Sequence, residues 1–125
     1  MAVTYFIGLN EKENHDFDTE KFNRDIKQRF PNVIISESSE YNYNILWEDD
    51  ADEYKFNLSM ERNRCAFAID YFNSANRIYD YAKFIIWLRS YFPVGKEVIL
   101  CDESYNRSLV LGQDISIDKI VGVLE

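Results

Sequence analysis

The chain has 125 residues, with 14 Lys and Arg against 22 Asp and Glu, which gives a net charge of −8. Hydrophobic residues make up 46% of it, including nine Tyr, nine Phe and two Trp, so it is too apolar for a disordered acidic segment. Because the basic residues are scattered among the carboxylates, nucleic acid and anionic membranes are disfavoured as partners. We expect a single domain over residues 1–125.

The cellular location is predicted from the N-terminus, the apolar segments and the cysteines. The stretch from Met1 to Lys12 lacks the basic start and long apolar run of a signal peptide. No segment contains the ~20 consecutive apolar residues that span a bilayer. The two cysteines, Cys65 and Cys101, lie in predicted strands, where buried reduced thiols are more common than a disulfide. We therefore expect a cytoplasmic protein.

The first predicted elements are a strand, a helix and a second strand. Val3 to Leu9 has apolar side chains on both faces, as in a central strand. Asp18 is placed to cap a helix that Pro31 ends. The buried stripe of this helix is predicted to be Phe22, Ile26 and Phe30. A strand over Asn32 to Ile35 would, after such a crossover, most simply run parallel to the first strand.

Three alternating segments and one long apolar helix follow. Tyr41–Trp47, Tyr54–Met60 and Cys65–Tyr71 each place apolar residues on one face, which predicts an antiparallel meander with one buried face. Ser74 to Phe92 has apolar residues at three- and four-residue spacing and ends before Pro93. We expect this helix to pack across the buried face of the meander.

The C-terminal part is predicted to add a strand, a short strand and a short helix. Glu97 to Cys101 is apolar on both faces, Ser108 to Leu111 is short, and Asp114 or Ser116 can cap the helix. The predicted fold class is α+β, with a mixed, largely antiparallel sheet packed against two main helices. The element order is compatible with a ferredoxin-like core to which a C-terminal strand and helix are added.

The sequence contains no motif for a cofactor. No GxGxxG, P-loop or GxSxG occurs, and one histidine and two distant cysteines do not give the spacing of a zinc site. His15 stands beside Asp16, but no nucleophile accompanies them, so a surface loop is the better interpretation. We expect neither a cofactor nor a catalytic residue of recognisable type.

A calcium site is considered because three carboxylates fall at EF-hand positions. Asp50, Asp52 and Glu61 occupy positions one, three and twelve of that spacing. Tyr54 stands at position five and Lys55 replaces the glycine of the sharp turn, while the flanking segments are predicted strands. The pattern therefore fails, and we expect no metal.

The strongest candidate for a binding site is an acidic run between two predicted strands. Its carboxylates, with two more that precede the first of these strands, form the predicted partner-binding set: Glu37, Glu40, Glu48, Asp49, Asp50, Asp52 and Glu53. Long-range attraction from such a set favours a basic protein partner, although a solvated hairpin tip is the simpler interpretation.

Two other classes of function remain open. Asp102 to Tyr105 follows an interior strand, a position at which α/β proteins often place functional groups. A small enzyme or metabolite-binding domain would use this turn together with His15, but a turn-forming role is the better interpretation of Asp102 to Tyr105. A structural subunit that self-associates through the edge of the meander is the third class.

In size, acidity, aromatic content and α+β pattern, the chain resembles the small cytoplasmic immunity proteins that bacteria keep against toxins. This resemblance concerns the type of protein and carries no residue across. It implies a one-to-one complex in which the protein neutralises a basic toxin, such as a nuclease. Acidic residues would steer the toxin and exposed aromatic residues would anchor it.

Overall fold

The computed structural model describes residues 3–9, 17–51, 53–112 and 114–125. Its elements alternate in an α+β order, with one helix after the first strand, one after the fifth and one at the C-terminus. The elements are β1 (Tyr5–Leu9), α1 (Thr19–Arg29), β2 (Ile34–Glu37), β3 (Tyr43–Asp50), β4 (Tyr54–Glu61), β5 (Ala66–Ser74), α2 (Arg77–Arg89), β6 (Val98–Asp102), β7 (Ser108–Val110) and α3 (Ile117–Leu124).

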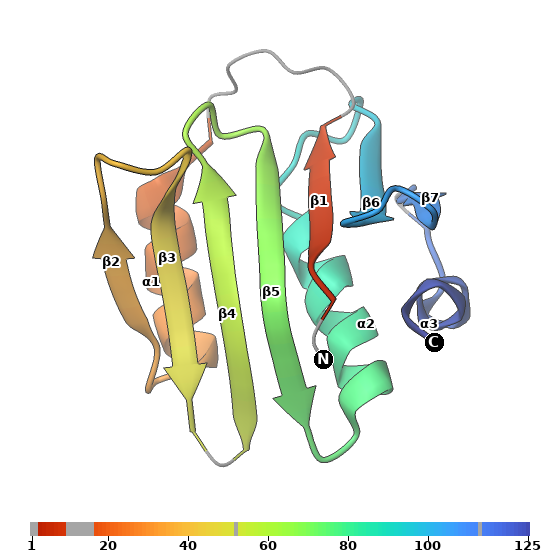
Figure 1. Ribbon diagram of the computed structural model, residues 1–125, viewed down its shortest axis with the longest axis horizontal. Coiled ribbons are helices and arrows are strands. Elements are labelled where there is room, and N and C mark those ends of the chain that lie inside the picture. The colour runs from red at the N-terminus through yellow and green to blue at the C-terminus, as the bar shows by residue number, and fades with distance from the viewer. Residues whose placement is uncertain (1–2, 10–16, 52, 113) are drawn as a thin grey trace.

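The strands form one seven-stranded sheet in the order β2-β3-β4-β5-β1-β6-β7 (Figure 1). Every neighbouring pair is antiparallel. The predicted meander is confirmed as β3-β4-β5, and β1 is a central strand because β5 and β6 flank it. The expectation of a mixed sheet is wrong. The ferredoxin-like expectation is not confirmed, since this sheet has more strands than that fold.

The second strand runs in the same direction as the first, as predicted, but the two strands do not pair with each other. Both edges of β1 are taken by β5 and β6, so β2 pairs with β3 and becomes an edge strand. A short connection joins β2 to β3, and strands that follow each other closely pair antiparallel at a low cost in chain entropy. β1 and β2 still point the same way in Figure 1, with β3, β4 and β5 between them.

Helices α1 and α2 lie on one face of the sheet, where the aromatic core forms (Figure 1). Asp18 caps α1 as predicted, because its carboxylate accepts a hydrogen bond of 3.0 Å from the amide of Lys21. The core side of α2 is also as predicted. Its fully or nearly fully buried residues include Tyr81, Ala82, Phe84, Ile85 and Leu88. Helix α2 is shorter than predicted, because β5 continues to Ser74.

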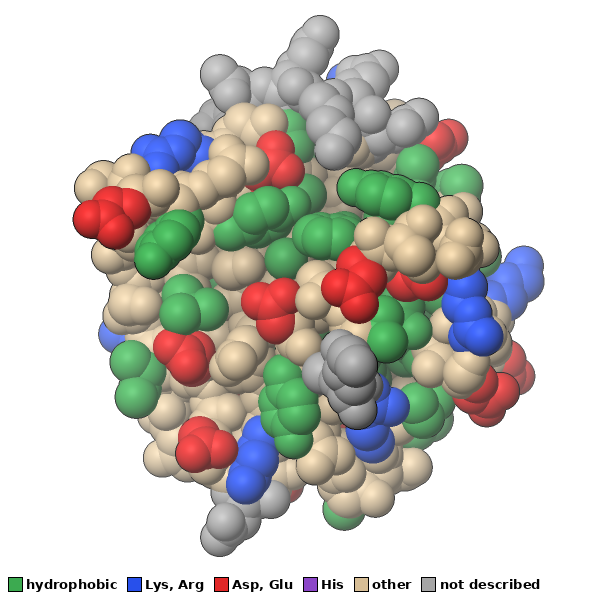
Figure 2. Space-filling model, viewed as in Figure 1, with side chains coloured by type: hydrophobic (Ala, Val, Ile, Leu, Met, Phe, Trp, Pro, Cys, Tyr) green, Lys and Arg blue, Asp and Glu red, His purple; other side chains and the backbone are tan. Residues whose placement is uncertain are grey.

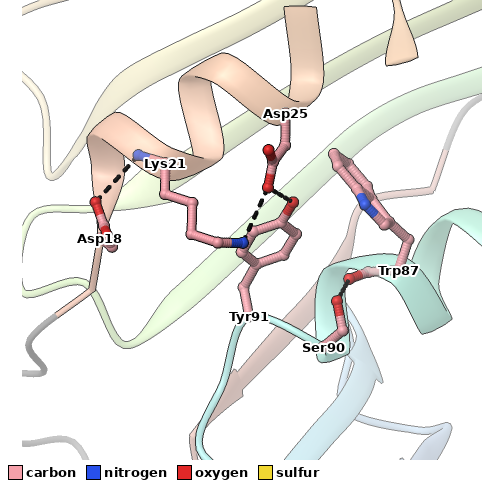
Figure 3. A network of polar contacts seen from close by, with 6 residues as sticks. All are labelled: Asp18, Lys21, Asp25, Trp87, Ser90 and Tyr91. Atoms are coloured by element: carbon pink, nitrogen blue, oxygen red, sulfur yellow. Dashed lines mark hydrogen bonds and ion pairs between the residues drawn. The ribbon is translucent and has the colours of Figure 1, made fainter. Parts of the chain in front are cut away.

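Aromatic rings and a polar network join α1 to α2. Trp87 of α2 lies with its ring centroid 5.3 Å from that of Phe22 on α1. Beside them, the Tyr91 hydroxyl donates a 2.6 Å hydrogen bond to Asp25, whose same oxygen lies 3.1 Å from the Lys21 ammonium (Figure 3). The hydrogen bond from Tyr91 and the Lys21 cation lower the pKa of Asp25 below its usual value. The network fixes the contact between the two helices at the side facing solvent.

The C-terminal helix packs against α2 and β7. Ser116 is its cap, since the serine hydroxyl accepts from the Lys119 amide, and Ile120 and Leu124 are buried. The guanidinium of Arg107 donates to the backbone carbonyls of Val123 and Glu125, which ties the helix end to the strand pair β6-β7. In the part of the chain that the structure describes, no helix is both long and apolar enough to cross a membrane.

Candidate functional site

The candidate site lies on the face of the sheet that α1 and α2 leave uncovered, which we call the open face (Figure 1). Alternation along the strands directs one set of side chains to the helices and the other set to this face. The open face should be polar if it served only to contact water. Instead, it carries half-buried aromatic and aliphatic side chains with carboxylates among them (Figure 2). The basic side chains seen in this view lie nearer the rim.

A β-bulge in β3 puts Tyr43 on the open face, where the sequence pattern had predicted a core residue. Tyr43 pairs with Glu61 and Ile45 pairs with Met60, so Asn44 is the extra residue. Such an insertion reverses the face of every side chain beyond it. Ile45 remains in the core and Tyr43 does not.

A second bulge, in β5, does the same to Tyr71. Asn57 pairs with Tyr71 and Leu58 pairs with Ile69, which leaves Asp70 as the extra residue. Phe72 takes the buried position instead, and Tyr71 is exposed. Both bulges therefore enrich the open face in tyrosine.

Tyr43 and Glu61 form a hydrogen-bonded pair on this face, at one end of the β3-β4 ladder. The tyrosine hydroxyl donates to the Glu61 carboxylate over 3.3 Å. Glu61 is only 9% exposed, although the alternation of β4 had placed it on a wet face. Burial and the adjacent Glu61 charge raise the pKa of Tyr43, so its hydroxyl stays a donor at neutral pH.

The first of two hollows beside this pair is called the Tyr43 pocket and has a volume of about 560 Å³. The rings of Phe6 and Tyr43 lie 6.2 Å apart at 47°. Position 8 of this pocket requires a glycine, because a Cβ at Gly8 would lie only 2.7 Å from the Cβ of Ala66. Among the described residues, its lining is mainly apolar, contains no Lys or Arg, and consists of Phe6, Gly8, Leu9, Tyr43, Glu61, Cys65, Ala66, Ile99, Cys101, Tyr105 and Ser108.

The second hollow adjoins the first at Tyr43 and has a volume of about 540 Å³. It is more polar, and no Lys or Arg is found in the part of its lining that the structure describes, which consists of Ser36, Glu37, Ser38, Tyr41, Asn42, Tyr43, Asn44, Leu46, Ser59 and Asp70. Glu37, Asp70 and Glu61 together give the two hollows three carboxylates. The combined surface is thus concave, partly aromatic and negatively charged.

The predicted acidic set is not one patch in the structure. Glu37 and Glu40 are exposed at one end of β3, while Glu48 and the hairpin carboxylates lie toward its other end. Glu48 is exposed on the open face, and its backbone partner is Asn57. Only Glu37 among the predicted residues lines one of the hollows.

The carboxylates at the tip of the hairpin have different roles. Asp49 is only 5% exposed, and its side chain accepts a hydrogen bond of 2.9 Å from the amide of Ala51, which fixes the turn. The side chain of Asp50 is 96% exposed and lies 3.9 Å from the Lys55 ammonium. Glu53 is exposed, and Asp52 lies outside the described residues.

The alternative site at Asp102 to Tyr105 is a turn. The carboxylate of Asp102 accepts hydrogen bonds from the amides of Asn106 and Arg107 and from the Ser104 hydroxyl. Burial acts to raise the pKa of Asp102, but these hydrogen bonds outweigh it and lower the pKa. The carboxylate is therefore used in holding the turn. His15, the other residue of this alternative, lies outside the described residues.

Of the three carboxylates at EF-hand spacing, the two that the structure describes do not come together, and Asp52 lies outside the described residues. Asp50 and Glu61 lie toward opposite ends of the β3-β4 ladder, as their pairing with Lys55 and Tyr43 shows. Among the described residues, no group of three or more His, Cys, Asp or Glu side chains is placed to hold a metal ion.

The comparisons with protein-family models, curated proteins and solved structures gave no match.

Proposed function

We propose that this protein is an acidic protein-binding module that binds a basic protein partner through the open face of its sheet. The observation that carries the proposal is the pair of adjoining hollows, whose described lining residues include aromatic rings and three carboxylates but no Lys or Arg. Aromatic residues in concave, partly desolvated surfaces are typical anchors of protein interfaces. Carboxylates around them favour a positively charged partner and speed its encounter.

In its most specific form, the proposal is that the partner is a basic toxin, such as a nuclease, and that this protein is its immunity protein. The net charge of −8 and the resemblance in size and α+β pattern support this form. The partner would be identified by affinity purification from the native host. Its activity would then be measured with and without one equivalent of this protein, and we expect inhibition at a one-to-one ratio.

The binding face can be located with two double variants that change the net charge equally. Glu48→Gln with Asp70→Asn neutralises two carboxylates of the open face, whereas Glu20→Gln with Asp118→Asn neutralises two exposed ones on α1 and α3. With the purified partner at low salt, we expect the open-face variant to associate about three- to tenfold more slowly. The control variant should stay within about twofold, because its charges are farther from the contact.

Salt dependence provides the check on this reasoning. Near ~0.5 M salt, the screening length falls to several ångströms, and the difference between the two variants should nearly vanish. Equal slowing by both variants would show that net charge alone steers the partner and would remove the open face from the proposal. A stable dimer of this protein that excludes the partner would favour self-association instead.

A further inference from the structure

We infer that the Tyr43 pocket binds a guanidinium group, which in the proposed complex is an arginine side chain of the basic partner. The inference rests on the proposed function for the identity of the partner but not for the chemistry of the pocket. It follows from three observations. A buried carboxylate in the lining forms no ion pair with a described residue, aromatic side chains lie beside it, and one of these aromatic residues is held at the pocket by a strained backbone conformation.

The buried carboxylate is that of Glu61. Its residue is 9% exposed and lines the pocket, and it forms no ion pair within the described part of the chain. The two nearest arginines in sequence are directed elsewhere. Arg62 donates to the backbone carbonyls of Ser39 and Tyr41, and Arg64 donates to the Asn44 side chain and to the main-chain carbonyl of Glu61. A mostly buried carboxylate with a single tyrosine donor is more stable with a cation beside it.

Three aromatic residues contribute to the pocket lining. Phe6 and Tyr43 lie with ring centroids 6.2 Å apart, and Tyr105 adds a third ring from the turn between β6 and β7. The face of an aromatic ring attracts a cation within about 6 Å of its centre, and the attraction grows when water is excluded. A carboxylate together with several rings, with no basic residue among the described lining residues, is therefore suited to an organic cation.

Tyr105 is held at the pocket by a backbone conformation that a tyrosine rarely adopts. Its φ is +59°, and its amide donates a 3.1 Å hydrogen bond to the carbonyl of Asp102. Asp102 in turn fixes this loop with its own side chain. The ring of Tyr105 contributes little to the core, since the residue is 74% exposed. Strain of this kind is commonly kept where a side chain must be presented to a ligand.

The shape of the pocket favours guanidinium over ammonium. A guanidinium is planar, so it stacks on aromatic rings, and it donates two parallel hydrogen bonds to one carboxylate. It is also less strongly hydrated than an ammonium, so it enters a mainly apolar pocket more readily. The volume of about 560 Å³ lies within the range of about 300–1,000 Å³ typical of ligand pockets, so a long side chain and adjoining backbone fit.

The test uses the full chain and a defined probe, Nα-acetyl-L-arginine N-methylamide, followed by NMR of backbone amides. The matching citrulline derivative is the control, because it has nearly the same shape but carries a neutral urea. We expect saturable shifts at Gly8, Ala66 and Ile99 with the arginine probe and at least about tenfold weaker binding of the citrulline probe. Equal binding of the two probes, or shifts spread away from these residues, would overturn the inference.

Three variants separate the contributions of the pocket. Glu61→Gln removes the charge and should weaken the arginine probe about tenfold or more, whereas Glu20→Gln, which removes an exposed charge on α1, should leave it within about twofold. Tyr105→Asn removes a ring but keeps a residue that tolerates positive φ, and should weaken binding about two- to fivefold. Thermal unfolding shows whether each variant is folded. If Glu61→Gln is unfolded, Tyr105→Asn provides the test of the pocket.

The outcomes distinguish this inference from the proposed function. If a basic partner binds the open face but its affinity does not change in Glu61→Gln, the protein-binding function stands and the inference is wrong. If the arginine probe binds in the pocket and is lost in Glu61→Gln, the inference holds even when no basic protein partner binds. The protein-binding function would then be wrong, and the pocket would serve a small guanidinium compound.

Discussion

Replacing Arg89 with Met should destabilise the protein although Arg89 forms no ion pair with a described residue. Arg89 is 6% exposed at the end of α2, and its guanidinium donates to three backbone carbonyls. Its Nε lies 2.9 Å from the Leu111 oxygen, and its two terminal nitrogens lie 3.3 Å from the oxygens of Phe92 and Lys96. The side chain thus joins the end of α2 to the loop before β6 and to the segment after β7.

The magnitude follows from two opposing contributions. Three hydrogen bonds from a charged donor contribute about 1.5 kcal/mol each, or about 4–5 kcal/mol in total. Burial lowers the pKa of Arg89, so the charge carries a desolvation cost that the uncharged variant no longer has. Met fills much of the volume of the arginine stem and leaves little cavity. We therefore expect Arg89→Met to lower the free energy of unfolding by about 2–4 kcal/mol.

Urea unfolding monitored by circular dichroism would measure this change, with Arg24→Met as the matched control. Arg24 lies exposed on α1, so its replacement should change the free energy of unfolding by less than about 0.5 kcal/mol. Arg89→Lys should lower the free energy of unfolding by more than Arg24→Met but by less than Arg89→Met, because an ammonium cannot reach all three carbonyls together. An Arg89→Met protein within about 1 kcal/mol of wild type would refute the reasoning and show that desolvation cancels the hydrogen bonds.

Two further predictions concern the aromatic core and the contact between α1 and α2. The Tyr81 hydroxyl is buried with no hydrogen-bond partner among the described residues. Tyr81→Phe should therefore leave the free energy of unfolding unchanged or raise it by up to ~1 kcal/mol. A loss above ~1 kcal/mol in urea unfolding would show that the hydroxyl has a partner. The lowered pKa of Asp25 stabilises the fold above its unfolded-state pKa of about 3.9, and this contribution is lost as the pH falls through the folded-state pKa. Because Tyr91 is the largest cause, Tyr91→Phe should move the Asp25 pKa upward in an NMR titration of the carboxyl carbons, and an unchanged value would contradict the network in Figure 3.

Much of the fold was predictable because local chemistry determined it. Asp18 caps α1 through its own side chain, and the alternation in β4 buries Phe56, Leu58 and Met60. The apolar residues on both faces of β1 indicated its central position. In these places propensity, capping and burial all favour the same structure.

The pairing of β2 and the two bulges were not predictable in the same way. Pairing depends on which sheet edges are free after the rest of the chain has folded, and no local residue records this. A bulge adds one residue to one strand, and the pattern of Tyr41, Tyr43 and Ile45 looks regular on either side of it. In the turn after β4, Arg64 adopts a positive φ, and the neighbouring Asn63 side chain accepts a hydrogen bond from the Cys65 amide. The sequence pattern did not reveal the candidate site, because the two bulges move Tyr43 and Tyr71 onto the open face.

The distribution of the aromatic residues gives a separate reason to regard the open face as functional. Eight of the nine phenylalanines are buried in the core, whereas only Tyr5 and Tyr81 among the nine tyrosines are. The core is therefore filled mainly by phenylalanine, and Tyr54 and Tyr91 pack against its edge. Tyrosine keeps a polar hydroxyl and is favoured where one end of a side chain must stay wet, as at protein interfaces. The one phenylalanine outside the core, Phe6, lies against Tyr43 in the pocket, where a ring without a hydroxyl contributes only an apolar face. Folding does not require that ring to be exposed, but stacking against a bound cationic side chain does.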